Sequence, residues 1–462
     1  MTLIKSISGI RGTIGGASNE NLTPIDAVRF ASAYATWVKS RTDSKPKVVI
    51  GRDARPSGPM ISDLVAASLI GSGIDVVDLG LSTTPTVEVA VPLENADGGI
   101  ILTASHNPIE WNALKLLNEK GEFISGEEGA TLLEIAEKKD FSYVEVGELG
   151  ELTQDESYLQ KHIDQILALP LVDADSISDQ GFKVVVDGVC SSGGIAIPAM
   201  LKALGVTEVI ELHCEPTGIF PHNPEPLREH LQDIMTKVVE ENADLGIVVD
   251  PDVDRLAFIT EKGEMFGEEY TLVAIADYIL SKTPGNTVSN LSSTRALRDL
   301  SKDHGVSYSA SAVGEVNVVK MMKETNAVIG GEGNGGVIYP ELHYGRDALV
   351  GVALMLSHIS EQKKSMSELK ASYPQYEISK NKIQLQASMD VDQILKEVMN
   401  QFSGEEISTI DGVKIDFEKE WVHLRKSNTE PIIRVYSESD SKESAEQLAQ
   451  KVMSEISKIA GI

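Results

Sequence analysis

The sequence predicts an α/β protein with three similar domains built on parallel or mixed sheets, followed by a smaller α+β domain. Three observations support this expectation. The chain has 462 residues, which exceeds the size at which one hydrophobic core keeps growing. Apolar β-branched runs alternate with helical segments, a pattern typical of parallel sheets with helices on both faces. The repeated units lie more than a hundred residues apart, so they indicate similar domains and not a short-period solenoid.

The repeated unit is an apolar strand, a loop rich in Gly, Asp and Ser, and then a helix. Its strands are expected at 47–50, 183–186 and 287–290. The loops follow at 51–58, 187–194 and 291–294, and the helices run to about residues 72, 204 and 301. Open α/β sheets bind their ligands at the carboxyl ends of the strands, so functional residues are expected in such loops.

The domain boundaries follow from changes in composition. A charged stretch at 145–156 is interpreted as a linker, and the strand after Arg255 should close the second domain. A helical run at 347–372 should close the third, and Pro374 restricts the chain to an extended hinge after it. The tail ends in an amphipathic helix at 441–459. The expected domains are 1–150, 151–258, 259–373 and 374–462.

Composition excludes several classes of partner. The net charge of −29, from 70 acidic and 41 basic residues, argues against nucleic acid and anionic membranes. No stretch approaches a membrane span, and the first residues lack the pattern of a signal peptide. Two cysteines, Cys190 and Cys214, are too few for a disulfide framework, so a cytoplasmic location is expected. The expected partner is a small phosphorylated molecule, bound by a monomer or a homodimer.

The most informative segment is Thr103–Pro108, which follows the apolar run 99–102. It places the hydroxyl of Ser105 beside the imidazole of His106 at the end of a buried strand. Adjacent side chains on an extended segment point to opposite faces, so His106 is not expected to deprotonate Ser105. Lys115 is expected on a strand at 113–117 that returns toward Ser105, where its amine could act as a general acid or base with a lowered pKa. A lysine on the protein surface is an equally good interpretation of this position.

A second chemical segment begins where the apolar run 245–249 ends. Asp250, Asp252 and Asp254 recur at alternate positions, so an extended chain projects them to one side, and Arg255 follows. Three carboxylates suit Mg²⁺, and an arginine can hold a phosphate bound to the same ion. An EF-hand is excluded because Arg255 stands where that loop needs glycine. A serine at one strand end and an oxygen-ligand metal site at another suggest a phosphoserine handled by a divalent cation.

Two further loops carry polar groups suited to a sugar phosphate. The segment 330–336 presents Glu332 and Asn334 among glycines, and these side chains can hydrogen-bond vicinal hydroxyls. The segment 425–434 collects donors to phosphate oxygens around a turn, which predicts an anion clamp. Its proposed ligands are Arg425, Ser427, Asn428, Thr429 and Arg434. The proline-rich loop 220–226 has no role that its residues indicate.

Together these segments resemble the α-D-phosphohexomutase superfamily over the whole chain and in the same order. The matching segments are 9–12, Thr103–Pro108 with Lys115, Asp250–Arg255, 331–336 and 425–431. The resemblance implies three related α/β domains and a smaller fourth domain around one central cleft. A haloacid-dehalogenase-type phosphatase with Asp250 as its nucleophile is the remote alternative, because the run 249–253 fits that local motif. It leaves the serine, sugar and phosphate loops unexplained.

The resemblance also implies roles for the residues. Ser105 carries the transferred phosphoryl group, and Ser105 with the three aspartates holds Mg²⁺. Arg11, Lys115 and Arg255 surround that group, and His106 is counted with them as catalytic. Glu332 and Asn334 hold sugar hydroxyls, and the clamp at 425–429 holds the phosphate that is not transferred. The implied activity is an intramolecular phosphotransfer through a sugar 1,6-bisphosphate, which also serves as activator.

The choice of sugar rests on two departures from the hexose type. Asn334 and Gly336 stand where the family's sugar loop often has serine and histidine, and Glu315 stands near a position where hexose mutases carry histidine. These features look most like phosphoglucosamine mutase, so glucosamine 6-phosphate and glucosamine 1-phosphate are the expected pair. Phosphoglucomutase or phosphomannomutase activity is the alternative.

Overall fold

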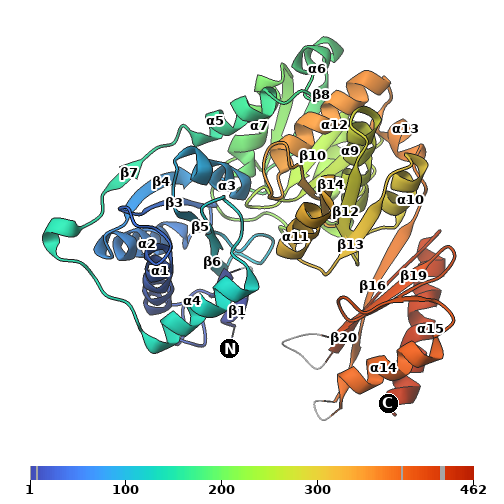
Figure 1. Cartoon of the computed structure of the whole chain (residues 1–462). Helices are drawn as coiled ribbons and strands as arrows, with labels where there is room; N and C mark the ends of the chain where they lie inside the picture. Colours follow the sequence, from blue (N-terminus) through green and yellow to red (C-terminus); the bar gives the residue numbers. More distant parts are fainter. Residues whose placement is uncertain (1, 7–8, 387–388, 427–431, 462) are drawn as a thin grey trace. The chain divides into compact units, whose positions relative to one another are not determined.

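The computed structural model describes residues 2–6, 9–386, 389–426 and 432–461 (Figure 1). Its described residues form two compact units. The first comprises Met1–Ile279 and Asn334–Leu369, and the second comprises Leu280–Gly333 and Lys370–Ile462. Ser427, Asn428 and Thr429 of the expected phosphate clamp lie outside the described residues.

The first sheet of the first unit is mixed, with strand order β1-β2-β6-β5-β3-β4-β7. Strands β3, β4, β5 and β7 run parallel, whereas β1, β2 and β6 join by antiparallel pairing. The strands are β1 (Ile4–Ser6), β2 (Gly9–Thr13), β3 (Lys47–Arg52), β4 (Asp75–Leu81), β5 (Gly98–Leu102), β6 (Trp111–Leu117) and β7 (Leu152–Gln154). The helices are α1 (Pro24–Lys39), α2 (Gly58–Gly71), α3 (Thr84–Leu93), α4 (Gly126–Lys138) and α5 (Tyr158–Leu167), with a 3₁₀ turn at Val146–Glu148.

Alternation along β3 shows how this sheet forms two cores. Val48 and Ile50 pack with α1 and α2, whereas Val49 packs with α3 on the other face. A strand turns successive side chains to opposite faces, and burying both faces calls for the continuous β-branched run that the sequence has here. The expected linker at 145–156 is corrected in part, because β7 lies within it and pairs with β4.

The second sheet of this unit has the order β11-β10-β8-β9, with β8, β9 and β10 parallel and β11 antiparallel at the edge. Its elements are β8 (Lys183–Asp187), β9 (Glu208–Leu212), β10 (Leu245–Val249), β11 (Leu256–Thr260), α6 (Ala174–Gln180), α7 (Gly193–Ala203) and α8 (Gln232–Glu240), with a 3₁₀ turn at Arg228–His230. The chain then forms α9 (Glu268–Lys282). It returns to the first unit at Asn334, where it forms β15 (Gly336–Ile338), α12 (Ala348–Gln362) and α13 (Met366–Ala371). Helix α12 packs against α5, α6 and α7.

The second unit contains a parallel sheet and an antiparallel sheet. In the first, β12 pairs in parallel with β13 and β14. Its elements are β12 (Asn286–Asn290), β13 (Tyr308–Ser311), β14 (Ala327–Glu332), α10 (Ala296–Asp303) and α11 (Glu315–Thr325). In the second, the antiparallel order is β16-β20-β19-β18-β17, packed against the helices α14 and α15. Its elements are β16 (Glu377–Gln384), β17 (Glu406–Ser408), β18 (Val413–Asp416), β19 (Trp421–Lys426), β20 (Ile432–Ser439), α14 (Val391–Gln401) and α15 (Lys442–Ala460).

The predicted fold class of three α/β domains followed by an α+β domain is confirmed by these four sheets. The described residues contain no helix that is both long enough and apolar enough to cross a membrane.

Candidate active site

Ser105 and the three aspartates come together in the first unit, although the chain separates them by 145 residues. The loop after β5 carries Ser105, and the loop after β10 carries Asp250, Asp252 and Asp254. The Ser105 hydroxyl donates a 2.6 Å hydrogen bond to Asp250 Oδ2. All three aspartates are fully buried, and one carboxylate oxygen from each lies within 4.8 Å of the others.

The aspartate cluster fits a divalent cation. Asp252 Oδ1 and Asp254 Oδ1 are buried and accept no hydrogen bond from the described residues. Buried carboxylate oxygens without a donor are costly unless a cation binds them. Burial raises the pKa of Asp250, and the negative charges of Asp254 and Asp252 raise it further. Hard oxygen donors at this spacing can hold a metal ion such as Mg²⁺.

Lys115 reaches the same cluster because β5 and β6 form the antiparallel return expected from the sequence. Its neighbour across the sheet is Ile101, and its Nζ lies 2.6 Å from Asp252 Oδ2 and 3.3 Å from Asp254 Oδ2. Burial alone would lower the pKa of Lys115, but the two carboxylates outweigh it, so the pKa is raised. The lowered pKa expected for Lys115 is therefore wrong, and its amine is positively charged beside the aspartates.

His106 is closer to Ser105 than an extended chain allows. Ser105 adopts a left-handed conformation with φ of 51°, and this turn brings His106 Nδ1 within 3.4 Å of Ser105 Oγ. The expectation of opposite faces is therefore wrong at this position. Burial, together with the positive charge of Arg255, lowers the pKa of His106 to about 2, so the imidazole is neutral.

Arginines surround the cluster on several sides. Arg255 Nε lies 3.9 Å from Asp250 Oδ2, and its Nη1 lies 3.2 Å from Glu225. Arg11 Nη1 donates to Asn107 Oδ1 at 3.3 Å. Arg346, which the sequence analysis missed, donates to Asp254 Oδ2 at 2.7 Å. These guanidinium groups can neutralise the charge of a phosphoryl group, which is the main task in phosphoryl transfer.

Arg55 is a second residue that the sequence analysis missed. It is fully buried and holds the serine loop through hydrogen bonds to backbone carbonyls. Its Nη2 donates to the carbonyls of Ser105 and Asn107 at 2.5 and 2.7 Å, and its Nη1 donates to those of Pro108 and Trp111 at 2.6 and 3.0 Å. Its Nε donates to Asp53 Oδ2 at 2.9 Å. The only sequence signal is its position in the polar loop after β3, the first copy of the repeated unit.

Arg55→Lys should destabilise the protein and slow catalysis. All five N–H groups of Arg55 are used, and lysine has only three donors on one atom, so buried carbonyls would lose their partners. The expected loss of unfolding free energy is about 3 kcal/mol, measured by urea denaturation. Arg52→Lys is the control, because its Nη1 donates only to the Asp53 carbonyl at 3.2 Å among the described side-chain hydrogen bonds. Equal effects of the two changes would refute this role for Arg55.

The loop 220–226 supports this site. The ring of Phe220 lies 5.0 Å from the Arg55 guanidinium, and Glu225 pairs with Arg255. His222 Nε2 lies 3.1 Å from Asp187 Oδ2. The loop therefore contacts both arginines that serve the serine and aspartate loops, which its sequence did not indicate.

The expected sugar and phosphate residues lie mostly in the second unit. Glu332 Oε1 accepts hydrogen bonds from Asn290 Nδ2 at 2.8 Å and from the backbone N–H of Gly314 at 3.0 Å. Glu315, which follows, begins α11 and is 8% exposed. Asn334 belongs to the first unit, and its Oδ1 accepts from the Gly336 N–H at 3.2 Å.

Arg425 and Arg434 are direct neighbours across the pair β19 and β20. Like charges placed opposite one another destabilise a sheet, so an anion bound between them would be favourable. Arg425 Nε pairs with Asp411 Oδ2 at 2.9 Å, and the same oxygen accepts from the Val313 N–H at 3.0 Å. A cavity of about 380 Å³ lies beside Arg425, and its lining also includes Asp411 and Lys426. Asp411 therefore links the clamp to the 313–315 segment that also contacts Glu332.

Comparison with known proteins shows the family of this chain. The four phosphoglucomutase/phosphomannomutase family domains match in order: α/β/α domain I at 4–143, domain II at 160–263, domain III at 267–376 and the C-terminal domain at 379–455. The chain belongs to the phosphoglucomutase/phosphomannomutase family, part of the α-D-phosphohexomutase superfamily. It is accordingly an enzyme of the mutase class of isomerases, and the dehalogenase alternative is set aside.

Individual relatives carry names for both expected activities. A phosphoglucomutase/phosphomannomutase of Thermococcus kodakarensis is 36% identical over 94% of this chain and 96% of its own. A probable phosphoglucosamine mutase of Methanopyrus kandleri is 34% identical over 96% of this chain and 95% of its own. The crystal structure of a family protein from Burkholderia thailandensis matches with a TM-score of 0.85 at 26% identity, covering 100% of this chain and 98% of that one.

Proposed function

We propose that this phosphohexomutase interconverts glucosamine 6-phosphate and glucosamine 1-phosphate through a phosphorylated Ser105. The observation that carries the proposal is the Ser105 hydroxyl, hydrogen-bonded to Asp250 inside a cluster of three buried aspartates with Lys115 beside it. A hydroxyl held against a cation site and surrounded by arginines suits a phosphoryl group that is carried and transferred, and not hydrolysed.

The reaction would proceed by two transfers. The C1 hydroxyl of glucosamine 6-phosphate attacks the phosphorus of phospho-Ser105, the bond from phosphorus to Oγ breaks, and the proton of that hydroxyl ends on Ser105 Oγ. The resulting 1,6-bisphosphate turns round, and Ser105 Oγ attacks the phosphorus at C6. The bond from that phosphorus to the C6 oxygen breaks, the serine proton ends on the C6 oxygen, and the 1-phosphate is released. The same bisphosphate, added as activator, would phosphorylate a bare serine again.

Each residue near Ser105 has a task in this scheme. His106 Nδ1 lies 3.4 Å from Oγ, and because its pKa is lowered to about 2 the ring stays neutral and can hydrogen-bond to the Ser105 hydroxyl. Lys115, Arg11, Arg255 and Arg346 supply positive charge around the phosphoryl oxygens. Asp250, Asp252, Asp254 and Ser105 would hold Mg²⁺, which supplies charge neutralisation to the transferred group.

The remaining expected residues would recognise the rest of the substrate. Glu332 and Asn334 would hold sugar hydroxyls, and Arg425 and Arg434 would bind the phosphate that is not transferred, with Ser427, Asn428 and Thr429. Two buried carboxylates, Glu332 and Glu315, support an amino sugar, because an ammonium group at C2 gains more from a carboxylate than a hydroxyl does. The names of several relatives agree, whereas the Thermococcus kodakarensis relative favours the glucose or mannose alternative. The two free cysteines fit a reducing cytoplasm.

The sugar is tested by kcat/KM for the 6-phosphates of glucosamine, glucose and mannose with the same Mg²⁺ and activator. We expect at least a tenfold preference for glucosamine 6-phosphate. Glu315→Gln should reduce kcat/KM for that substrate more than for glucose 6-phosphate, because it removes only the charge. A tenfold preference for glucose or mannose 6-phosphate would overturn the choice of sugar and leave the transfer scheme intact.

A further inference from the structure

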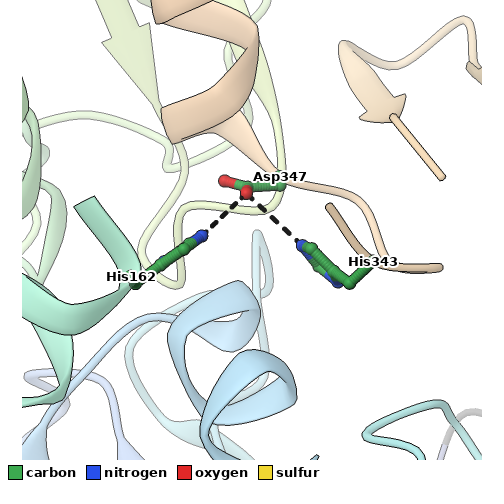
Figure 2. A group of neighbouring side chains, drawn as sticks. All are labelled: His162, His343 and Asp347. Carbon is green, nitrogen blue, oxygen red and sulfur yellow. Dashed lines mark hydrogen bonds and ion pairs between the residues drawn. The ribbon is translucent and has the colours of Figure 1, made fainter. Parts of the chain in front are cut away.

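A second group of metal-ligand side chains lies in the first unit, outside the aspartate cluster. It consists of His162 on α5, His343, and Asp347 at the N-cap of α12 (Figure 2). His162 and Asp347 are fully buried, and the His343 side chain is 11% exposed. The transfer scheme uses none of these three residues.

The inward atoms of this His–Asp–His cluster converge on one carboxylate oxygen. His162 Nε2 lies 3.0 Å and His343 Nε2 lies 3.3 Å from Asp347 Oδ2, as the dashed lines in Figure 2 show. Four-coordinate zinc with bonds of about 2.0–2.1 Å separates its ligands by about 3.3 Å. The two separations that involve Asp347 are close to this value, and all three ligand atoms lie within 4.8 Å of one another.

The outer nitrogen of each histidine also has a partner. His343 Nδ1 lies 3.4 Å from Glu88 Oε2, and His162 Nδ1 lies 3.1 Å from Thr86 Oγ1. A histidine that binds a metal almost always donates its other N–H to a carboxylate or another oxygen, which fixes the tautomer. Glu88 and Thr86, both on α3, provide oxygen partners for the two rings.

The charges in the cluster also favour a dication. Two buried carboxylates, Glu88 and Asp347, flank His343 on its two ring nitrogens. A dication bound at this cluster would add positive charge beside both carboxylates, which is favourable in a buried site.

We propose that His162, His343 and Asp347 bind one Zn²⁺ ion, with a water molecule as the fourth ligand. Two imidazole nitrogens and one carboxylate oxygen suit zinc and similar transition metals, whereas Mg²⁺ prefers oxygen ligands. The two metal sites of this unit are therefore chemically distinct. Zinc at the His–Asp–His cluster serves structure, because it joins α5 to the start of α12 while α3 holds both rings.

The zinc site would also position a residue of the active site. Arg346 precedes Asp347 in the chain, and it pairs with Asp254 at 2.7 Å. Asp347 Oδ1 accepts from the backbone N–H groups of Leu349 and Val350, so the same carboxylate fixes the start of α12. Gly345 lies against the Glu88 carboxylate, where a Cβ atom would collide with it.

The test uses the full-length protein, stripped of metal with a chelator and then titrated with Zn²⁺ in the presence of excess Mg²⁺. Metal content after dialysis is measured by mass spectrometry, and Co²⁺ in place of Zn²⁺ reports the ligand geometry by its visible absorption. We expect one tightly held zinc per chain and a higher Tm with zinc, since the ion binds only the folded state. Glu88→Gln should weaken zinc binding roughly 10- to 100-fold.

Variants distinguish the His–Asp–His cluster from another possible zinc site in the chain. His162→Gln and His343→Gln should lose the zinc, and Asp347→Asn, which keeps an oxygen for the cap of α12, should lose it while remaining folded. The control is His213→Gln with His222→Gln, because these histidines and Asp187 form another possible cluster. Zinc lost only in that control, zinc retained in His343→Gln, or no stoichiometric zinc in the wild type would each overturn the proposal.

Discussion

Ser105→Ala should reduce mutase turnover roughly 10,000-fold or more, as is typical when a covalent nucleophile is removed. Alanine lacks the Oγ that would carry the phosphoryl group, and the hydrogen bond to Asp250 is lost with it. The fold should be unchanged, because alanine and serine both carry a Cβ atom and have the same steric requirement in the left-handed backbone conformation of residue 105. The measurement is formation of the 1-phosphate isomer, together with the mass of the intact protein.

Peptide mapping supplies the control for that result. The wild-type protein treated with a sugar 1,6-bisphosphate should gain one phosphoryl group on the peptide that contains Ser105, and the variant should gain none. His106→Gln should retain more activity than Ser105→Ala, since it removes a neighbour of the Ser105 hydroxyl and not the phosphoryl carrier. Phosphate found on Asp250, or wild-type turnover in Ser105→Ala, would refute the phosphoserine scheme.

Removal of the divalent cation should abolish transfer, and Mg²⁺ should restore it. The three buried aspartates lie within 4.8 Å of one another, and two of their oxygens accept no hydrogen bond from the described residues. Without the cation, their negative charge would repel the phosphoryl group. Activity is measured after exhaustive chelation, with the metal content checked directly. Full activity in protein shown to be metal-free would contradict this prediction.

The same cluster predicts how Mg²⁺ affinity changes with pH. Because burial and the neighbouring aspartates raise the pKa of Asp250, this carboxyl keeps its proton to a higher pH than usual when no cation is present. Bound Mg²⁺ must displace that proton, so its affinity should fall as the pH falls through the raised pKa. Glu438→Gln is the matched control, since Glu438 is also buried with a raised pKa but accepts hydrogen bonds from Trp421 and the backbone of Arg295. It should leave the Mg²⁺ titration unchanged.

Local patterns were sufficient to predict the class of fold and the chemical segments. The β-branched run at 47–50 and the apolar run at 245–249 are strands because both their faces are buried, which demands continuous apolar residues. The return of Lys115 toward Ser105 also followed from local order, since a proline-containing loop between two apolar runs favours an antiparallel pair. In each case the structural signal spans only a few neighbouring residues.

The pKa values and partners of side chains could not be predicted from the sequence where they depend on residues far away along the chain. The pKa of Lys115 is raised because Asp252 and Asp254, more than 130 residues away, lie beside its amine. Arg55 and Arg346 look like ordinary surface arginines in the sequence, and only the folded chain places them on the serine loop and on Asp254.

The motif segments, through their resemblance to the phosphohexomutase superfamily, were sufficient to predict the activity. The expected extended geometry of Asp250, Asp252 and Asp254 is wrong, because Val253 has a φ of 64° and a turn brings the three carboxylates together. Tertiary structure decides their charge and conformation. Ser105 turns into a left-handed backbone beside His106, and His162, His343 and Asp347 meet although the chain separates the first two by 181 residues. Electrostatic interactions and metal ligation act across space over a few ångströms, whereas a sequence pattern records only order along the chain.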